Sequence, residues 1–92
     1  MDIIWGQHGD VVTIYPNPVQ HVLNIDLFAV KAQYTLVKIL DMSGRLVKQI
    51  QVQSEAGMNK MQVELAELAE GIYAVQVYAN DELISVSKVR KN

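Results

Sequence analysis

From residue 11 onward, short segments of alternating apolar and polar residues are separated by residues typical of turns. An alternation with a period of two places the apolar side chains on one face of an extended strand, because successive side chains point to opposite faces. Each segment meets a turn signal too soon for a long helix. We therefore expect seven strands, over residues 11–15, 21–28, 33–40, 45–53, 59–65, 72–79 and 83–90.

Evenly spaced strands joined by short turns favour an all-β fold, either an antiparallel sandwich or a barrel. Residues 33–40 are the most apolar of the segments, so we expect a central strand that is buried on both faces. Residues 64–70 are rich in alanine, leucine and glutamate but give barely two turns of helix before Gly71. We expect a short turn there that carries Leu65 and Leu68 inward.

The predicted turns contain residues with restricted or unusual backbone conformations. Pro16 and Pro18 remove two backbone donors and fix an extended corner. We expect this corner to stiffen the point at which an upstream linker, residues 1–10, leaves a domain of residues 11–92. In the following turn the Asp41 side chain can bond the backbone ahead of it, and Gly44 can adopt a positive φ.

Length and composition limit the functions that this chain can have. Its 92 residues make one domain, 50% hydrophobic and 20% charged, with no room for a deep active-site cleft. The net charge of −2 argues against binding of nucleic acid, and the absence of cysteine excludes a thiol nucleophile. No stretch approaches the ~20 apolar residues of a membrane span. The first residues do not resemble a signal peptide, so we expect any export signal to lie upstream.

The candidate catalytic residues do not combine into a catalytic pattern. His8 and His21 are far apart in sequence and lack a carboxylate at ligand spacing. Asp41 and Ser43 are explained by the turn, and no histidine lies nearby in sequence. Three glutamates with helical one-face spacing are typical of a solvated surface: Glu64, Glu67 and Glu70. We expect neither an enzyme nor a cofactor or metal site.

The end of the chain is basic. Lys88, Arg90 and Lys91 lie close to the last residue, and no acidic residue follows Glu82. Lys88 and Arg90 share a strand face because they are two positions apart. Two interpretations remain open: the charges protect the edge of a sheet, or they form a positive docking strip for a partner.

Five motifs occur in one order along the chain. Residues 14–18 read Ile-Tyr-Pro-Asn-Pro, followed by Leu-Asn-Ile at 23–25, and residues 37–47 enclose an Asp-x-x-Gly turn between two apolar runs. Residues 57–59 read Gly-Met-Asn, residues 65–73 contain Leu-x-x-Leu-x-x-Gly-x-Tyr, and the end is lysine-rich. Together, over about residues 12–92, they resemble the type A C-terminal sorting domain of the type IX secretion system, also called the Por system.

The resemblance implies a seven-stranded antiparallel Ig-like β-sandwich and a non-catalytic role. Such domains end proteins that are exported across the outer membrane of Bacteroidota. The implied partners are the outer-membrane translocon, the shuttle and the sortase-like components of the secretion system, together with a covalently fused upstream cargo. The sortase-like peptidase usually removes the domain and joins the cargo to an anionic lipopolysaccharide. The implied location is the periplasm in transit, then the cell surface or the medium.

The resemblance also gives roles to individual residues. We expect Lys88, Arg90 and Lys91 to contact the partner, through charge or by strand addition to an exposed last strand. A second set maintains the fold: Pro16, Asn17, Pro18, Asp41, Gly44, Gly71 and Tyr73. Within it, Gly71 allows a sharp return of the chain, and Tyr73 buries its ring and bonds its hydroxyl, as tyrosine corners do. An extended linker predicts a cleavage region around Gly6, Gly9 and Asp10.

The main alternative is an adhesive or carbohydrate-binding sandwich of a cell-surface protein. Such modules present aromatic residues on one surface, whereas here they are dispersed along the sequence: Trp5, Tyr15, Phe28, Tyr34, Tyr73 and Tyr78. A cluster of exposed aromatic side chains would favour this alternative. Exposed edge strands would also allow a homodimer.

Overall fold

A computed structural model describes residues 9–92 as seven β-strands. The strands are β1 (Val11–Tyr15), β2 (Val22–Ala29), β3 (Gln33–Leu40), β4 (Leu46–Ser54), β5 (Gly57–Glu64), β6 (Gly71–Ala79) and β7 (Glu82–Lys91). All seven predicted strands are confirmed, with bounds that shift by one or two residues at most. The expectations for Trp5, Gly6 and His8 lie outside the described residues.

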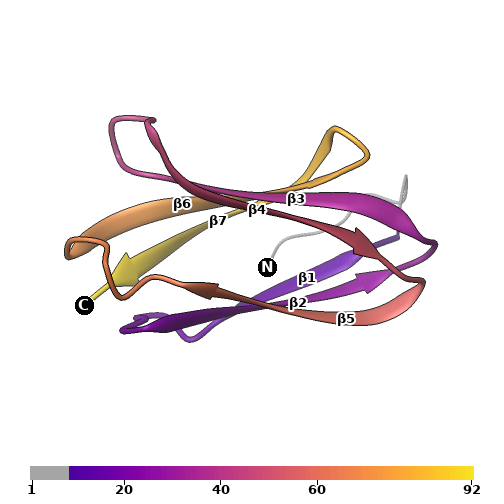
Figure 1. Cartoon of the computed structure of the whole chain (residues 1–92), viewed down its shortest axis with the longest axis horizontal. Coiled ribbons are helices and arrows are strands. Elements are labelled where there is room, and N and C mark those ends of the chain that lie inside the picture. The colour runs from indigo at the N-terminus through magenta and orange to yellow at the C-terminus, as the bar shows by residue number, and fades with distance from the viewer. Residues whose placement is uncertain (1–8) are drawn as a thin grey trace.

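The strands form two antiparallel sheets that face each other, as Figure 1 shows. One sheet has the order β1-β2-β5 and the other the order β4-β3-β6-β7. Hairpins join β3 to β4 and β6 to β7, whereas the connections after β2, β4 and β5 cross between the sheets. The fold is therefore the predicted Ig-like sandwich and not a closed barrel.

The core is formed by the inward-facing residues of both sheets. Those with no solvent exposure include Leu23, Ile25, Leu27, Val37, Ile39, Val75 and Val77. Each such side chain stabilises the folded state by roughly 1.5–3 kcal/mol through burial of apolar surface. Because the chain has no cysteine, this packing replaces the disulfide that joins the sheets of many Ig domains.

The prediction that β3 is buried on both faces is wrong for its outer face. Val37 and Ile39 are fully buried, but Leu36 and Leu40 on the opposite face are only half-buried. β3 is central in its sheet, yet an antiparallel sandwich covers only one face of each sheet. The outer face of the four-stranded sheet is therefore more apolar than a purely solvated surface.

The segment between β5 and β6 is a turn and not a helix, as expected. The Leu68 amide donates to the Leu65 carbonyl at 3.0 Å, and Leu65 is fully buried while Leu68 packs partly against the core. Lys48 of β4 donates to the Glu64 carbonyl and to the Glu67 carboxylate, which fixes the turn to the opposite sheet. That contact lowers the pKa of Glu67 below its ordinary value.

Candidate functional site

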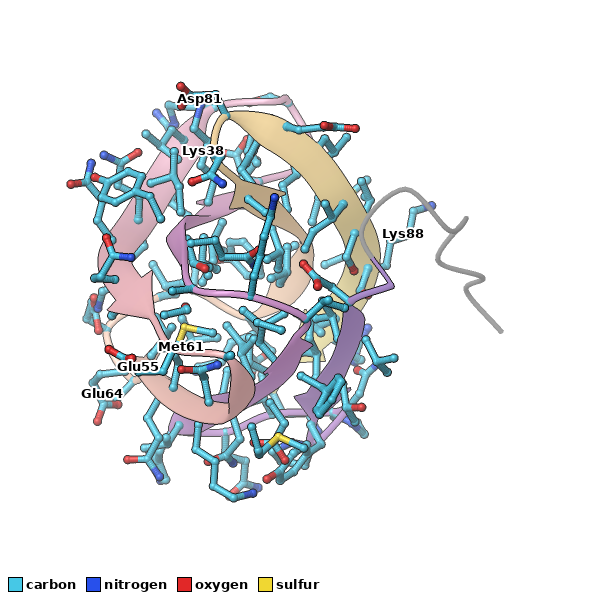
Figure 2. The ribbon with its side chains drawn as sticks, turned by 90° about the vertical axis from the view of Figure 1, so that its right-hand side faces the viewer. Lys38, Glu55, Met61, Glu64, Asp81 and Lys88 are labelled. Carbon is cyan, nitrogen blue, oxygen red and sulfur yellow. The ribbon has the colours of Figure 1, made fainter. Side chains whose placement is uncertain are left out.

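The last strand presents two of the three predicted basic residues to solvent. Lys88 and Arg90 are exposed on the outer face of β7, and Figure 2 shows Lys88 extending away from the sandwich. Lys91 is 6% exposed, and its Nζ donates to the backbone oxygen of Asn92 at 3.0 Å. The prediction that Lys91 belongs to the docking strip is therefore wrong, because alternation along the strand turns Lys91 to the inner side with Val89.

The free edge of β7 is covered near its end by residues 17–19, which we name the Asn17 clamp. The Asn17 amide acts like a strand backbone: its Nδ2 donates to the Lys88 carbonyl at 3.2 Å, and its Oδ1 accepts from the Arg90 amide at 2.9 Å. The Val19 amide donates to the Arg90 carbonyl at 2.8 Å, and the Asn92 amide donates to the Val19 carbonyl at 2.9 Å. Four hydrogen bonds thus join the start of the domain to its basic end.

The Asn17 clamp changes how the end of β7 can bind a partner. Strand addition requires outward-facing backbone groups, but those of Arg90 are already bonded by Asn17 and Val19. The predicted strand addition is therefore blocked over the clamped end of β7. What remains accessible there is the outer face, with the cationic side chains of Lys88 and Arg90.

The two prolines occupy a different place from the one expected. Pro16 and Pro18 follow β1 and lead towards β2, so they do not lie between the domain and the upstream chain. Their peptide bonds with Tyr15 and Asn17 are both cis. The expectation that they stiffen the departure of a linker is wrong, because β1 precedes them and pairs with β2. Their position instead brings Asn17 against β7.

The turn between β3 and β4 is built on Asp41. Its Oδ1 accepts from the Ser43 amide at 2.9 Å, the Ser43 hydroxyl at 2.6 Å and the Arg45 amide at 3.0 Å. Gly44 has a φ of +88°, a conformation that favours glycine. The Ser43 hydroxyl bond, with the Arg45 amide, holds the pKa of Asp41 below its ordinary value. Asp41 and Ser43 are thus engaged in the turn.

Tyr73 fixes the start of β6 beside the end of β7. It is 6% exposed, and its hydroxyl donates to the Ala69 carbonyl at 2.6 Å, four residues upstream. Gly71 is the first residue of β6 and lies directly opposite Lys91. The geometry is that of a tyrosine corner, in which a buried ring and a bonded hydroxyl lock the preceding turn.

Of the expected cleavage region, the structure describes Gly9 and Asp10, and Asp10 is folded into the domain. Gly9 is exposed, with a φ of +68°, but Asp10 is 1% exposed and its Oδ1 accepts from the Val30 amide at 3.0 Å. The assignment of Asp10 to an accessible linker is therefore wrong, because its carboxylate satisfies a backbone donor just after β2. The anchored domain begins at Asp10.

The other candidate chemistry does not assemble within residues 9–92. No group of three or more histidine, cysteine, aspartate or glutamate side chains in these residues could hold a metal ion. Glu64 Oε1 accepts from the Ala66 amide and Glu67 pairs with Lys48, so these two carboxylates serve the turn. No helix in this part of the chain is long and apolar enough to cross a membrane.

The exposed aromatic residues do not form one surface. Tyr15 and Phe28 lie at opposite ends of the outer face of the three-stranded sheet, since Tyr15 pairs with Asn24 and Phe28 with Val11. Tyr34 lies on the other sheet. Among the described residues, the aromatic cluster expected of a carbohydrate-binding module is not formed.

Comparison with known proteins agrees with this geometry. Residues 13–92 match the family described as the secretion system C-terminal sorting domain. The chain is similar in structure to dimeric latent PorU from Porphyromonas gingivalis, with a TM-score of 0.77, 22% identity and coverage of 94% of this chain and 10% of that chain. It thus spans about a tenth of the PorU chain.

Further solved structures show the same fold at lower similarity. An immunoglobulin-like protein from Pseudomonas aeruginosa has a TM-score of 0.52 and 12% identity, with coverage of 90% of this chain and 91% of that one. A beta-glucosidase from Listeria innocua has a TM-score of 0.52 and 15% identity, with 94% and 16% covered. No curated protein sequence matches the chain.

Proposed function

Because the chain belongs to the type IX secretion C-terminal sorting domain family, we propose that it directs a fused upstream cargo across the outer membrane by presenting Lys88 and Arg90 to the secretion machinery. The family role is that of a secretion signal, which implies export to the cell surface or the medium as part of a larger protein. In this proposal Lys88 and Arg90 carry the signal, and the fold presents them on the outer face of β7.

The observation that carries the proposal is the Asn17 clamp. Long charged side chains are normally mobile, and ordering them and their backbone on binding costs conformational entropy. Here the backbone beneath Lys88 and Arg90 is fixed by Asn17 on one side and by β6 on the other. The backbone positions from which the two cations project are thus fixed, which reduces the conformational entropy lost when a partner binds.

The proposed partner contact is made by side chains and not by strand pairing. Electrostatic docking to a surface with carboxylates needs exposed cations, and both Lys88 and Arg90 are exposed. Lys91 supports the end of the strand from the inner side instead of contacting the partner. The outer-membrane translocon, the shuttle and the sortase-like component are the candidates for this contact.

The proposed cleavage by the sortase-like component takes place upstream of the anchored domain. A peptidase binds its substrate in an extended form, and Asp10 is held to the backbone of Val30. We therefore place the cut before Gly9. Edman sequencing of the domain released by secreting cells tests this position, and a new N-terminus within β1 would contradict it.

A reporter fusion tests the recognition role. Residues 1–92 are fused behind a neutral periplasmic reporter in a host with the type IX system, and reporter at the cell surface and in the medium is measured. The double variant Lys88→Glu/Arg90→Glu is expected to reduce exported reporter at least about tenfold, because like charges across an interface oppose association. Lys31→Glu, which reverses an exposed lysine between β2 and β3, is the matched control.

Two outcomes would contradict the proposal. Retention of the wild-type fusion in the periplasm would contradict the secretion role of this chain. Normal export of the double variant, or equal loss in the double variant and the Lys31→Glu control, would contradict recognition through β7. Circular dichroism melting of the purified variants shows whether the domain is still folded, and we expect unchanged melting because both side chains are exposed.

A further inference from the structure

We propose that the outer face of the four-stranded sheet is a docking surface for a protein partner whose own surface carries carboxylates around an apolar patch. The inference rests on the proposed function, since Lys88 and Arg90 form one corner of this face, and it extends the contact across β6 to β3. We name the surface the outer docking face and define it by Lys38, Tyr78, Leu83, Val86, Lys88 and Arg90.

Strand register makes the outer docking face continuous. Tyr78 of β6 lies opposite Leu83 of β7, and Gln76 of β6 lies opposite both Val86 of β7 and Lys38 of β3. Adjacent strands are about 4.8 Å apart, so β3 and β7 are separated by on the order of 10 Å. A single protein surface therefore spans Lys38 and the end of β7.

The middle of the outer docking face is apolar. Leu83 is 46% exposed and Val86 is 48% exposed, and the half-buried ring of Tyr78 lies beside Leu83. Isolated exposed apolar residues need no explanation, whereas a contiguous apolar group is a candidate interaction surface. Here the cationic rim distinguishes this apolar group from the one on the other sheet. Removal of these side chains from water would contribute to binding.

The rim of the outer docking face is cationic. Lys38 is held with its Nζ 5.1 Å from the centre of the Tyr78 ring, and Lys88 and Arg90 lie at the other side. The strand positions that face outward between the two ends of this sheet carry no carboxylate. The nearby acidic residues lie at the ends, in the turn at Asp41 and around the turn at Asp81. Charge complementarity therefore selects an acidic partner.

The outer face of the other sheet has a different character. There Asp26 accepts hydrogen bonds from both Tyr15 and Lys60, and Glu64 ends β5, so acidic and basic groups are mixed. Opposite charges that satisfy one another leave little net field for a partner. That face also carries an exposed apolar row at one end, formed by Val11, Phe28 and Met58. The two outer faces therefore differ in their charge and not in the presence of exposed apolar residues.

The geometry favours a protein partner over a lipid. An amphipathic helix that binds a membrane surface buries its apolar face at the boundary between headgroups and acyl chains. The apolar side chains of the outer docking face instead lie within paired strands, with an apolar centre and a charged rim. That is the anatomy of a protein interface.

The first test compares export of reporter fusions that carry changes on the two outer faces. Lys38→Glu, Val86→Asp and Leu83→Asp are each expected to reduce exported reporter at least about tenfold. The matched controls are Lys31→Glu and Met58→Asp, since Met58 is 60% exposed on the other sheet. Melting curves of the purified domains verify that the variants fold. Val86→Asp and Leu83→Asp change the same apolar patch at two positions, so they test its role in export independently.

The outcomes separate this inference from the proposed function. Failure of the wild-type fusion to be exported would overturn the proposed function itself. Export of the wild type together with unimpaired export of folded Lys38→Glu and Val86→Asp would overturn only the outer docking face. Selective loss with these variants, against normal export of both controls, supports it.

The second test identifies the occupant by photocrosslinking in secreting cells. Benzoylphenylalanine replaces Val86 or, as the control, Met58, and the linked peptides are sequenced by mass spectrometry. We expect position 86 alone to link an envelope protein at a peptide rich in aspartate and glutamate. A lipopolysaccharide adduct, an adduct between two copies of this domain, or the same products from both positions would overturn the proposal.

Discussion

At the scale of single residues, Tyr73 connects the core to the turn before β6 through both parts of its side chain. The ring packs among buried residues, and the hydroxyl bonds the Ala69 carbonyl at 2.6 Å. This part-buried hydrogen bond lets the hydroxyl hold the turn against the buried ring. Since Gly71 lies opposite Lys91, this turn also sets where β7 ends.

Tyr73→Phe is expected to lower the free energy of unfolding by about 1 kcal/mol, because it removes the hydroxyl and keeps the ring. Tyr73→Ala is expected to cost about 3–5 kcal/mol, because it also leaves a cavity. Urea denaturation of the full chain measures both. Tyr34→Phe is the control, since that ring is 40% exposed. A Tyr73→Phe value equal to that of the control would rule out a role for the hydroxyl.

Residue roles that depend on local sequence were predictable, and roles that depend on distant contacts were not. The bonds of Asp41 stay within four residues, so the Asp-x-x-Gly pattern was enough to predict them. Asp10 bonds the amide of Val30, twenty residues away, and no local pattern indicates that. The inward position of Lys91 follows from alternation with Val89, but the basic composition of the tail obscured it.

At the scale of elements, β7 is an edge strand whose two halves have different environments. β6 pairs with β7 along its whole length, and the Asn17 clamp covers the opposite edge of β7 only near its end. Edge strands risk unwanted pairing with other chains, and proteins cover them with loops or charges. The Asn17 clamp covers the basic end with a loop from the opposite end of the sequence.

Asn17→Ala is expected to destabilise the domain by about 1–2 kcal/mol through loss of two hydrogen bonds. A local effect is also expected: amide hydrogen exchange at Arg90 should accelerate, because Asn17 Oδ1 accepts from that amide. Asn17→Asp keeps this acceptor but sets a carboxylate oxygen against the Lys88 carbonyl, so we expect protection at Arg90 between that of the wild type and that of Asn17→Ala. Asn24→Ala, which removes side-chain bonds with the Tyr15 carbonyl and the Gln62 side-chain amide on the other sheet, should leave exchange at Arg90 unchanged. Equal acceleration in both alanine variants would contradict the clamp.

The strands were predictable because apolar and polar residues alternate wherever one face of a strand is buried and the other is exposed. The pairing of β3 with β6 and the order of the strands in each sheet were not predicted, since a period of two does not identify the neighbouring strand. Neither the alternating pattern nor the family resemblance predicted the Asn17 clamp. A side-chain amide between two prolines can replace a peptide group, but its partner lies 71 and 73 residues further along the chain.

At the scale of the whole molecule, surface hydrogen bonds couple stability to pH at both ends of the range. Ser43 and Lys48 lower the pKa values of Asp41 and Glu67 below their ordinary 3.8 and 4.5. A carboxyl whose pKa is lower in the folded state stabilises it above the unfolded pKa, and this contribution is lost as pH falls through the folded pKa. Protonation of Asp41 and Glu67 therefore lowers the free energy of unfolding as the pH falls.

On the alkaline side, the hydrogen bond to Asp26 raises the pKa of Tyr15 above 10.0 and that of Lys60 above 10.5. A raised folded pKa gives stability that is complete below the unfolded pKa and is lost as pH rises through the folded one. Urea midpoints should thus be flat between about pH 5 and 9 and fall on both sides. Asp41→Asn should flatten only the acid limb and Asp26→Asn mainly the alkaline limb, because Asp26 is the acceptor shared by Tyr15 and Lys60. An alkaline limb unchanged by Asp26→Asn would show that these surface bonds do not couple to folding.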